Sequence, residues 1–266
     1  MTSTRLGITF GLAAGVVVAM APAARAQLAC GDTVPKGQTV TLTADLGPCD
    51  GTSDDSAVII EGTLDLGGHT VFCGDTSGDG VVPDGIYLRG SKAQVRNGTV
   101  RGCDDNVWVG GNGKHTIEGI TSTEAVEDGV YVASTSPKNR FTGNTVVSNG
   151  DDGFECRGAK NKIEGNTANN NAEDGIDLPD ALKNKVTGNT ATGNLDDGID
   201  VGGNKNKILA NTSTANGQYG IVVADTKNKI IGNTATGNIV ADIVGECANK
   251  FKDNTFGPGS ASSCVK

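Results

Sequence analysis

Residues 161–178 read NKIEGNTANNNAEDGIDL, residues 184–201 read NKVTGNTATGNLDDGIDV, residues 206–223 read NKILANTSTANGQYGIVV, and residues 228–237 read NKIIGNTATG. The asparagine of the NT dipeptide recurs at 144, 166, 189, 211, 233 and 254, at spacings of 22, 23, 22, 22 and 21 residues. Self-similarity at one fixed period indicates a stacked array in which each repeat packs only against its neighbours.

One repeat, read residue by residue, predicts three short strands joined by turns. Ile163 and Ala168 point inward, as do Ile176 and Leu178, whereas Asp177 between them points outward, because side chains alternate along a strand. Asparagine suits the turns, since it tolerates left-handed dihedral angles and can hydrogen-bond its counterpart in the next coil. Two asparagine ladders are therefore expected, through Asn144, Asn166, Asn189, Asn211 and Asn233, and through Asn149, Asn171, Asn194, Asn216 and Asn238.

Composition agrees with a narrow solenoid. Glycine accounts for 40 of 266 residues and aromatic residues for 4%. A compact globule needs more large apolar side chains than a solenoid interior one or two residues wide. Counting the GIxV strand backward predicts about nine coils, and about 4.8 Å per coil gives a rod roughly 40 Å long.

Two phrases resemble a known family. LDLGGHTV at residues 64–71 and the NTxxxNxxDGI phrases of the later repeats are similar to the right-handed parallel β-helix (pectin-lyase-like) proteins with NosD-type repeats, over roughly residues 64–256. The resemblance implies an all-β, right-handed parallel β-helix. It leaves the activity open, because that superfamily includes pectate and alginate lyases, epimerases, hydrolases and non-enzymes.

The chain divides into four expected segments. Residues 1–26 have the pattern of a signal peptide, 27–56 of an N-terminal cap, 57–256 of the β-helix and 257–266 of a C-terminal tail. We therefore expect an exported protein, periplasmic or extracellular, that has no membrane span and is a monomer. The formal net charge is −9, and loss of the signal removes two arginines, leaving −11. Such an acidic chain is not expected to bind nucleic acid or anionic lipid.

Seven cysteines in an exported chain predict disulfides with one cysteine left over. Cys156 takes an inward repeat position and is expected to be the buried free thiol. Stacking should join two cysteines that hold the same place in successive repeats, and the other pairs bracket the two ends of the chain. The expected disulfide residues are Cys30 and Cys49, Cys73 and Cys103, and Cys247 and Cys264.

The outward residue of the GIxV strand changes from aromatic to acidic along the chain. Aromatic faces bind sugar rings and carboxylates bind hydroxyls or transfer protons, so the line predicts a polysaccharide-binding groove. Alternatively, aromatic residues stand there because they favour strands. The candidate substrate-binding residues are Tyr87, Arg89, Trp108 and Tyr131, and the acidic continuation is Glu155, Asp177 and Asp200.

Catalysis is a further possibility that the resemblance raises. In the lyase and epimerase relatives an Arg, Lys or Tyr commonly abstracts the proton next to the carboxylate of a uronate. In glycoside hydrolases two carboxylates carry out the hydrolysis. The DPHE, GHG and RIK motifs of known relatives are missing from this sequence. The candidates for catalysis are Tyr131, Glu155, Arg157, Asp177 and Asp200.

Acidic pairs occupy the turn before this strand in five consecutive repeats. Their mutual repulsion needs an offset, which backbone N–H groups of the turns or bound calcium could supply. The candidate calcium ligands are Asp128, Asp152, Asp174 and Asp197. Copper and zinc are not expected, because His69 and His115 stand apart from each other and from a Cys or His cluster.

Three functions thus remain open. The first is a secreted β-helix that binds a polysaccharide, with cleavage or epimerisation as an extension. The second is a non-catalytic surface or envelope protein. The third is ice binding through the TxT pairs Thr190 and Thr192, Thr212 and Thr214, and Thr234 and Thr236, although Thr is common in strands. A file of lysines at 162, 185, 207, 229 and 250 is interpreted as a solvated face that blunts self-association.

Overall fold

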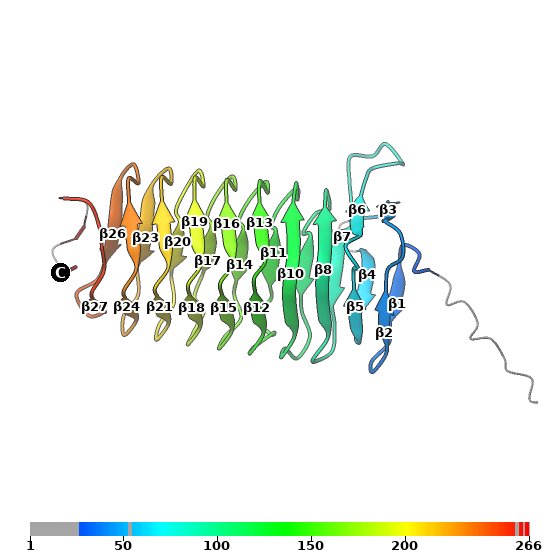
Figure 1. The fold of residues 1–266 in the computed structure, drawn as a ribbon, viewed down its shortest axis with the longest axis horizontal. Coiled ribbons are helices and arrows are strands. Elements are labelled where there is room, and N and C mark those ends of the chain that lie inside the picture. Colours follow the sequence, from blue (N-terminus) through cyan, green and yellow to red (C-terminus); the bar gives the residue numbers. More distant parts are fainter. Residues whose placement is uncertain (1–26, 53–54, 259–260, 263, 266) are drawn as a thin grey trace, which may run out of the picture.

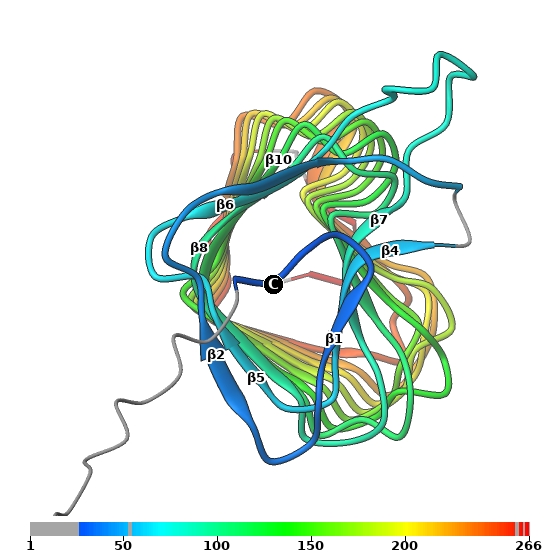
Figure 2. The ribbon, with the colours of Figure 1, turned by 90° about the vertical axis from the view of Figure 1, so that its right-hand side faces the viewer.

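The protein winds into ten stacked coils of parallel β-structure, shown side by side in Figure 1 and end-on in Figure 2. The computed structural model describes residues 27–52, 55–258, 261–262 and 264–265, so the predicted signal peptide lies outside the described residues. The expected parallel β-helix is confirmed, with coils of about 22 residues. The described part of the chain contains no helix that is long and apolar enough to cross a membrane.

Three parallel sheets run along the rod. Sheet 1 has one strand from every coil: β1 (Asp32–Val34), β4 (Ser56–Ile60), β7 (Asp84–Leu88), β9 (Val107–Val109), β11 (Val130–Val132), β14 (Phe154–Cys156), β17 (Ile176–Leu178), β20 (Ile199–Val201), β23 (Tyr219–Val223) and β26 (Ala241–Gly245). The long strands β8 (Gln94–Arg101) and β10 (Thr116–Thr123) belong to both other sheets.

Sheet 2 follows sheet 1 in each coil, after a connection that we call turn 1. Besides the first halves of β8 and β10 it contains β2 (Thr39–Thr41), β5 (Thr63–Asp65), β12 (Arg140–Thr142), β15 (Lys162–Glu164), β18 (Lys185–Thr187), β21 (Lys207–Leu209), β24 (Lys229–Ile231) and β27 (Lys250–Lys252).

Sheet 3 follows sheet 2 after the short turn 2, and turn 3 leads from sheet 3 back to sheet 1. Besides the second halves of β8 and β10 it contains β3 (Leu46–Cys49), β6 (Thr70–Cys73), β13 (Thr145–Val147), β16 (Thr167–Asn169), β19 (Thr190–Thr192), β22 (Thr212–Thr214) and β25 (Thr234–Thr236).

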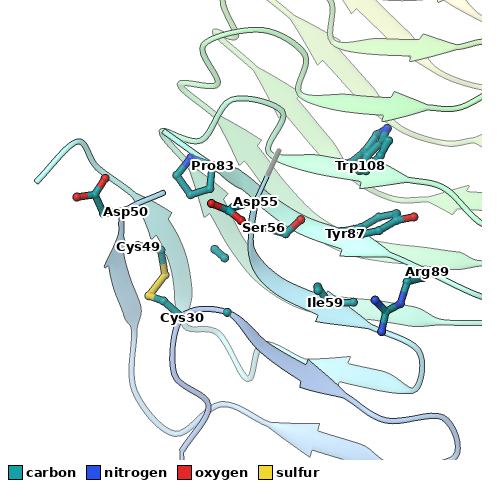
Figure 3. Close-up of a pocket in the computed structure, with 12 residues that line it drawn as sticks. Cys30, Cys49, Asp50, Asp55, Ser56, Ile59, Pro83, Tyr87, Arg89 and Trp108 are labelled. Atoms are coloured by element: carbon teal, nitrogen blue, oxygen red, sulfur yellow. A yellow bond between two sulfur atoms is a disulfide. The ribbon is translucent and has the colours of Figure 1, made fainter. Parts of the chain in front are cut away.

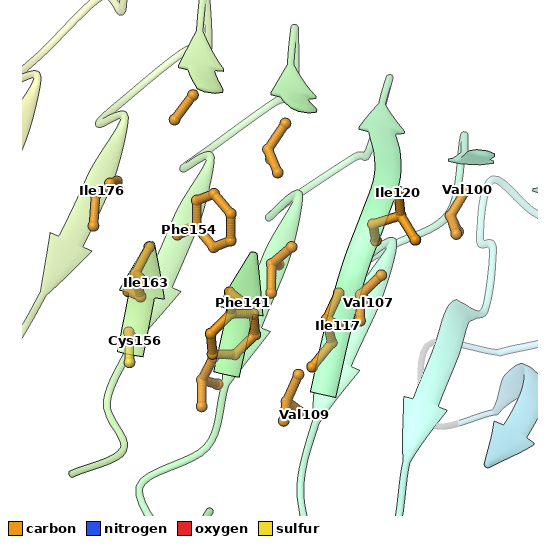
Figure 4. Packing of buried hydrophobic residues seen from close by; sticks show 14 of the residues in the cluster. Val100, Val107, Val109, Ile117, Ile120, Phe141, Phe154, Cys156, Ile163 and Ile176 are labelled. Atoms are coloured by element: carbon orange, nitrogen blue, oxygen red, sulfur yellow. The ribbon is translucent and has the colours of Figure 1, made fainter. Parts of the chain in front are cut away.

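Alternation along each strand fills the interior, as Figure 4 shows for the middle coils. In the fifth to seventh coils Phe141, Phe154, Ile163 and Ile176 are fully buried. Phe141 and Phe154 meet edge to face, with ring centroids 5.9 Å apart. Burying such side chains contributes about 1.5–3 kcal/mol each, and this apolar column supports the outward-facing residues of every coil.

Asparagine ladders fix the register of the turns. In turn 2 the Oδ1 atom of Asn189 accepts the N–H of Asn166 at 2.8 Å, and Asn189 in turn donates its N–H to Asn211 at 2.9 Å. Turn 3 holds a second ladder, in which the N–H of Asn171 reaches Oδ1 of Asn194 at 3.0 Å. Both predicted ladders are confirmed. A third, which was not predicted, runs through turn 1 along Asn139, Asn161, Asn184, Asn206, Asn228 and Asn249.

The two ends are closed by different segments. Residues expected to form an N-terminal cap themselves make the first coil, because β1, β2 and β3 pair in parallel with β4, β5 and β6. At the other end Ala261 bridges to Ile243 and Val265 is buried, so the tail lies across the last coil. The expected disulfides are confirmed as Cys30–Cys49, Cys73–Cys103 and Cys247–Cys264, and Cys156 is the buried free cysteine among the described residues.

Candidate functional site

The outward positions of sheet 1 form one line across the coils, because every strand pairs with the next in register. Neighbouring positions in this line stand about 4.8 Å apart, the spacing of paired strands. We call this line the sheet 1 file; from the first coil to the last it consists of Thr33, Ile59, Tyr87, Trp108, Tyr131, Glu155, Asp177, Asp200, Val222 and Val244.

The aromatic end of the file is organised by a stacked pair. The rings of Tyr87 and Trp108 lie with centroids 4.4 Å apart and planes inclined by 27°. Gly110 gives the Tyr87 ring its place, since a Cβ atom there would stand 2.7 Å from Cε2 of the tyrosine. The pair therefore presents a continuous aromatic surface over two coils, of the kind on which a sugar ring packs.

A pocket of about 410 Å³ opens beside this pair (Figure 3). Three of the four predicted substrate-binding residues, Tyr87, Arg89 and Trp108, line it, whereas Tyr131 does not. Nη2 of Arg89 lies 3.0 Å from Oε1 of Glu61, so the guanidinium is held at the edge of the pocket by an ion pair. The aromatic rings of Tyr87 and Trp108 and the guanidinium of Arg89 thus line one pocket.

The remaining walls come from the first two coils and were not predicted. Asp50, Asp55 and Ser56 supply polar groups, and Ile59 and Pro83 supply apolar ones. The disulfide Cys30–Cys49 borders the pocket and fixes the chain just before Asp50. Residues 27–56 lack the repeat motif, so sequence alone gave no register by which they could be aligned with Tyr87.

In the middle of the file an arginine bridges two coils. Nη2 of Arg157 lies 2.6 Å from Oε1 of Glu155, and its guanidinium carbon stands 5.9 Å from the centre of the Tyr131 ring. The hydrogen bond and charge of Glu155 raise the pKa of Arg157, and burial raises the pKa of the Tyr131 hydroxyl. At neutral pH both groups are therefore protonated, which suits binding of an anionic or hydroxyl-bearing sugar better than proton abstraction.

The acidic end of the file holds carboxyl groups that resist ionisation. Burial, with added repulsion from Asp200 and Asp174, raises the pKa of Asp177 to about 8. Burial likewise raises the pKa of Asp200. Asp177 consequently carries a proton at neutral pH and can act as a donor.

Turn 3 carries an aspartate ladder directly beside the file. Oδ1 of Asp152 accepts the N–H of Asp174 at 2.8 Å, and Oδ1 of Asp174 accepts the N–H of Asp197 at 2.7 Å. The same contact links Asp84, Asp105 and Asp128 in the preceding coils. Backbone N–H groups therefore do compensate part of the repulsion between the carboxylates, as one of the two alternatives predicts. These N–H groups belong to the next coil and not to the same turn.

Close packing holds these aspartates in place. A Cβ atom on Gly175 would stand 2.6 Å from Nδ2 of Asn194 and from the carbonyl oxygen of Gly198, so only glycine fits after Asp174. Burial and neighbouring carboxylates raise the pKa of five ladder members, to about 8 for Asp105 and Asp152, about 9 for Asp174, about 10 for Asp128 and about 6 for Asp197.

Several carboxylates converge closely enough to share a cation. Their oxygens lie within 4.8 Å of one another in three groups: Asp151, Asp152 and Glu173; Asp174, Asp177 and Asp200; and Asp174, Asp196 and Asp197. Of the four predicted calcium ligands, Asp152, Asp174 and Asp197 belong to these groups and Asp128 does not. Clusters made only of carboxylate oxygens are the donor set that calcium prefers.

Both histidines have structural partners. The ring of His115 is buried, with Nδ1 accepting the N–H of Ala93 at 3.0 Å and Nε2 3.0 Å from the carbonyl oxygen of Gly110. Burial lowers the pKa of His115. Nδ1 of His69 lies 3.4 Å from Oδ1 of Asp45. The structure thus places the two rings in separate environments.

Comparison with known proteins places the fold. A family model described as the right-handed beta helix region matches residues 84–256. No curated protein matches the chain in sequence.

Three solved structures with a similar fold share little sequence with the chain. The A-module of the mannuronan C-5 epimerase AlgE4 from Azotobacter vinelandii is 14% identical with a TM-score of 0.56, over 88% of this chain and 80% of that one. The Dettilon tailspike protein is 15% identical with a TM-score of 0.67, over 87% and 58%. Pectate lyase Pel9A is 15% identical with a TM-score of 0.54, over 85% and 78%. At these identities the likeness shows the fold alone.

Proposed function

The chain belongs to the right-handed beta helix family, and from this premise we propose that it binds an extracellular polysaccharide along the sheet 1 file. The observation that carries the proposal is the stacked pair of Tyr87 and Trp108, which lines the pocket together with Arg89. The fold neighbours support it, since they include a mannuronan epimerase and a pectate lyase by name. Three disulfides fit the proposed export.

The geometry favours a sugar chain that runs across the coils. The aromatic pair offers an apolar platform for one ring, and Arg157 over Tyr131 offers a charged group two coils further. Beyond it the carboxyl groups of Asp177 and Asp200 can hydrogen-bond to hydroxyls. A linear polymer is matched to such a file, whereas a single small ligand would use only the pocket.

Fluorescence tests this proposal directly, because Trp108 is the single tryptophan of the chain. Titration with neutral and acidic oligosaccharides is expected to change its emission, and Tyr87→Ala is expected to weaken binding about tenfold, or about 1.4 kcal/mol. Tyr219→Ala is the matched control, since Tyr219 does not line the pocket. Unchanged emission across the whole panel, or equal weakening by the control, would reject the groove.

A second candidate function, cleavage or epimerisation of the bound polysaccharide, is favoured by the raised pKa of Asp177, about 8. For cleavage, its protonated carboxyl can donate a proton to the leaving glycosidic oxygen while the carboxylate of Asp200 attacks the anomeric carbon. For epimerisation, Glu155 would remove the proton beside the uronate carboxyl and Asp177 would return one to the opposite face of the sugar. Asp200, one coil on, stands about 4.8 Å away along the strand spacing, near the roughly 5–5.5 Å of retaining glycosidases. In this function Tyr131, Glu155 and Arg157 contact the sugar.

Product analysis separates the two candidates. Incubation with polyuronates and neutral glycans, followed by absorbance of unsaturated ends, reducing-end assay and epimer analysis by NMR, is expected to show turnover that Asp177→Asn abolishes. Binding without any product in the unmodified protein would identify a non-catalytic surface protein. Binding by the Asp177→Asn variant serves as the control for folding.

Calcium is proposed as the ion of the acidic end for the binding function. Because a bound ion would ionise Asp177, calcium binding and the proton-donor role of Asp177 are alternatives. The group Asp174, Asp177 and Asp200 is best placed, because two of its members belong to the sheet 1 file and their oxygens lie within 4.8 Å of one another. When bound there, calcium would neutralise the carboxylates and attract an anionic sugar.

A further inference from the structure

Turn 1 contains a lysine at the same place in seven consecutive coils. Each has a left-handed backbone, with φ between 62° and 65°, and in most coils its N–H reaches the residue that precedes the next lysine. We call this row the inner row: Lys92, Lys114, Lys138, Lys160, Lys183, Lys205 and Lys227.

The backbone does not explain this choice of residue. A left-handed position favours glycine or asparagine, because a Cβ atom is crowded there. Turns 2 and 3 carry small residues at their left-handed positions in most coils, mainly Gly and Asn but also Ala and Ser: for example Asn97, Gly119, Gly143, Gly165, Gly188, Ala210 and Gly232 in turn 2, and Gly102, Ser148, Asn170, Gly193, Ala215 and Gly237 in turn 3. Only turn 1 keeps lysine through all seven coils, so the lysine side chain has a role of its own.

A second basic row runs parallel to the first, two residues later in each coil, at the start of sheet 2. This outer row consists of Arg140, Lys162, Lys185, Lys207, Lys229 and Lys250. The two rows together, which we call the lysine edge, hold thirteen of the twenty Lys and Arg residues between positions 27 and 266, in a protein of net charge −9.

In the residues that the structure describes, most of these charges make no ion pair. All of them are exposed except Lys185, which is half-buried. Glu164 pairs with Arg140 at 2.9 Å and with Lys185 at 2.8 Å. In the described part of the chain no member of the inner row makes an ion pair. The backbones of successive members lie about 4.8 Å apart, so their ammonium groups repel one another, and an anion bound between them would relieve this repulsion.

The lysine edge also contains a small surface pocket, which we call the hollow. A pocket of about 290 Å³ is lined by Leu182, Lys183, Asn204, Lys205 and Lys227. The nearby carboxylate of Asp225 is engaged, since it accepts a hydrogen bond from Nδ2 of Asn204 at 2.8 Å. Three cations from three successive coils therefore surround one small concavity.

We propose that the lysine edge binds a linear acidic polysaccharide, one that carries carboxylate or sulfate groups along its length. Regularly spaced point charges match a polymer with a regular repeat of anions. A nucleic acid fits less well, because the described residues include no exposed aromatic side chain on which bases could stack; Phe251, beside Lys250, packs against the core. In addition, twelve of the thirteen cations are lysines, which lack the bidentate geometry of arginine. The edge lies on turn 1 and sheet 2, so this inference does not depend on the sheet 1 file.

The test compares two triple variants of equal charge. Lys183→Gln, Lys205→Gln and Lys227→Gln together remove the lysines of the hollow. The control Arg96→Gln, Arg101→Gln and Lys252→Gln removes three exposed cations that belong to neither row. Polygalacturonate is the probe, with its methyl-esterified form as the uncharged counterpart, titrated calorimetrically at several NaCl concentrations. A Lys→Arg triple at the hollow keeps the charge and checks that the backbone tolerates substitution.

The expected result is binding of the charged polymer only, with an affinity that falls as salt rises. The hollow triple should weaken it about tenfold or more and make the salt dependence shallower by about two to three ionic contacts. The control and Lys→Arg triples should bind as the unmodified protein does. Equal weakening by the control triple, no binding at low salt, or tighter binding of a single-stranded oligonucleotide would overturn the proposal. In the hollow triple variant, neutral oligosaccharides should change the emission of Trp108 as much as they do in the unmodified protein. This result separates binding at the lysine edge from binding at the sheet 1 file.

Discussion

Asparagine and aspartate both accept a backbone N–H from an adjacent coil, but only aspartate can bring a negative charge into the turn. Asn189 donates through Nδ2 to the carbonyl of Ile163 at 2.9 Å as well as accepting a backbone N–H, so its amide is satisfied on both sides. In its ionised form Asp152 can only accept, as it does from the N–H of Asp174 at 2.8 Å. Ionised aspartates therefore bring charge into turn 3 that the ladder itself does not need, and we infer that this charge serves binding.

Asp152→Asn tests this reasoning at the residue scale. Burial raises the pKa of Asp152 to about 8 against an ordinary value of 3.8, so the folded protein is destabilised relative to the unfolded chain as pH rises from about 4 through 8. The amide keeps an acceptor for Asp174 and removes the charge. Thermal unfolding should show a Tm increase of about 3 °C or more at pH 8.5, from about 1 kcal/mol, and little change at pH 4. Asp253→Asn on the exposed surface should have no such pH-dependent effect, and a lower Tm at pH 8.5 for Asp152→Asn would contradict the argument.

At the scale of elements, turn 3 and sheet 1 act together as one acidic surface. The ladder presents one oxygen of each aspartate to the next coil, and Asp177 and Asp200 project from the adjacent strands. Burial and neighbouring carboxylates raise the pKa of Asp174 to about 9 and that of Asp177 to about 8. A bound divalent cation would favour their ionised forms and reverse the direction of those shifts.

Calcium should therefore stabilise the protein in a pH-dependent way. In chelator, stability should fall as pH rises from 5 to 8.5, because the folded protein holds protons that the unfolded chain has released. Added calcium should raise Tm at pH 8.5 and have little effect at pH 5, where protons occupy the same oxygens; at a hundredfold excess over its Kd it contributes about 2.7 kcal/mol. Asp200→Asn should lose this gain and Asp253→Asn should keep it. Identical melting curves with and without calcium at pH 8.5 would exclude the site.

How much of this the sequence could supply depends on the repeat. Where the 22-residue motif is clear, strand placement, inward residues and ladder asparagines follow from alternation and register, as for Ile163, Asn166 and Asp177. Residues 27–56 lack the motif, so neither the first coil nor the pocket wall at Asp55 was predictable. Only the outer row of the lysine edge was predictable: the sequence shows the row through Lys162, which we interpreted as a solvated face. The inner row through Lys160 is distinguished by its left-handed φ, which requires coordinates.

For the molecule as a whole, charge is segregated around the axis of the rod. The acidic surface lies on turn 3 and sheet 1, and the lysine edge lies on turn 1 and the start of sheet 2. Net charge alone, −9, conceals this arrangement, and so an argument from net charge about partners misses the basic edge. Because six or seven successive coils each contribute one residue to each row, both surfaces extend along the rod, which suits polymers as ligands.

Such a rod requires closed ends, and the last prediction concerns the C-terminal one. Ser262 donates its N–H to the carbonyl of Ile243 at 3.1 Å, Gly257 donates to Asp242 at 2.8 Å, and Val265 is buried. Deleting residues 257–266 in a Cys247→Ser background should uncover the edges of β26 and β27 and the apolar residues behind them. We expect a Tm lower by several degrees and concentration-dependent self-association in light scattering, because an uncovered parallel edge can pair with a second copy.

The full-length double variant Cys247→Ser, Cys264→Ser is the matched control, since it loses the disulfide but keeps the tail. It should remain monomeric in the same experiment, which assigns the effect to the covering segment. If the truncated protein stays monomeric with an unchanged Tm, the last coil is stable without a cover, and the end of the rod must be protected by the charges of Lys250 and Lys252 on its edge strand instead.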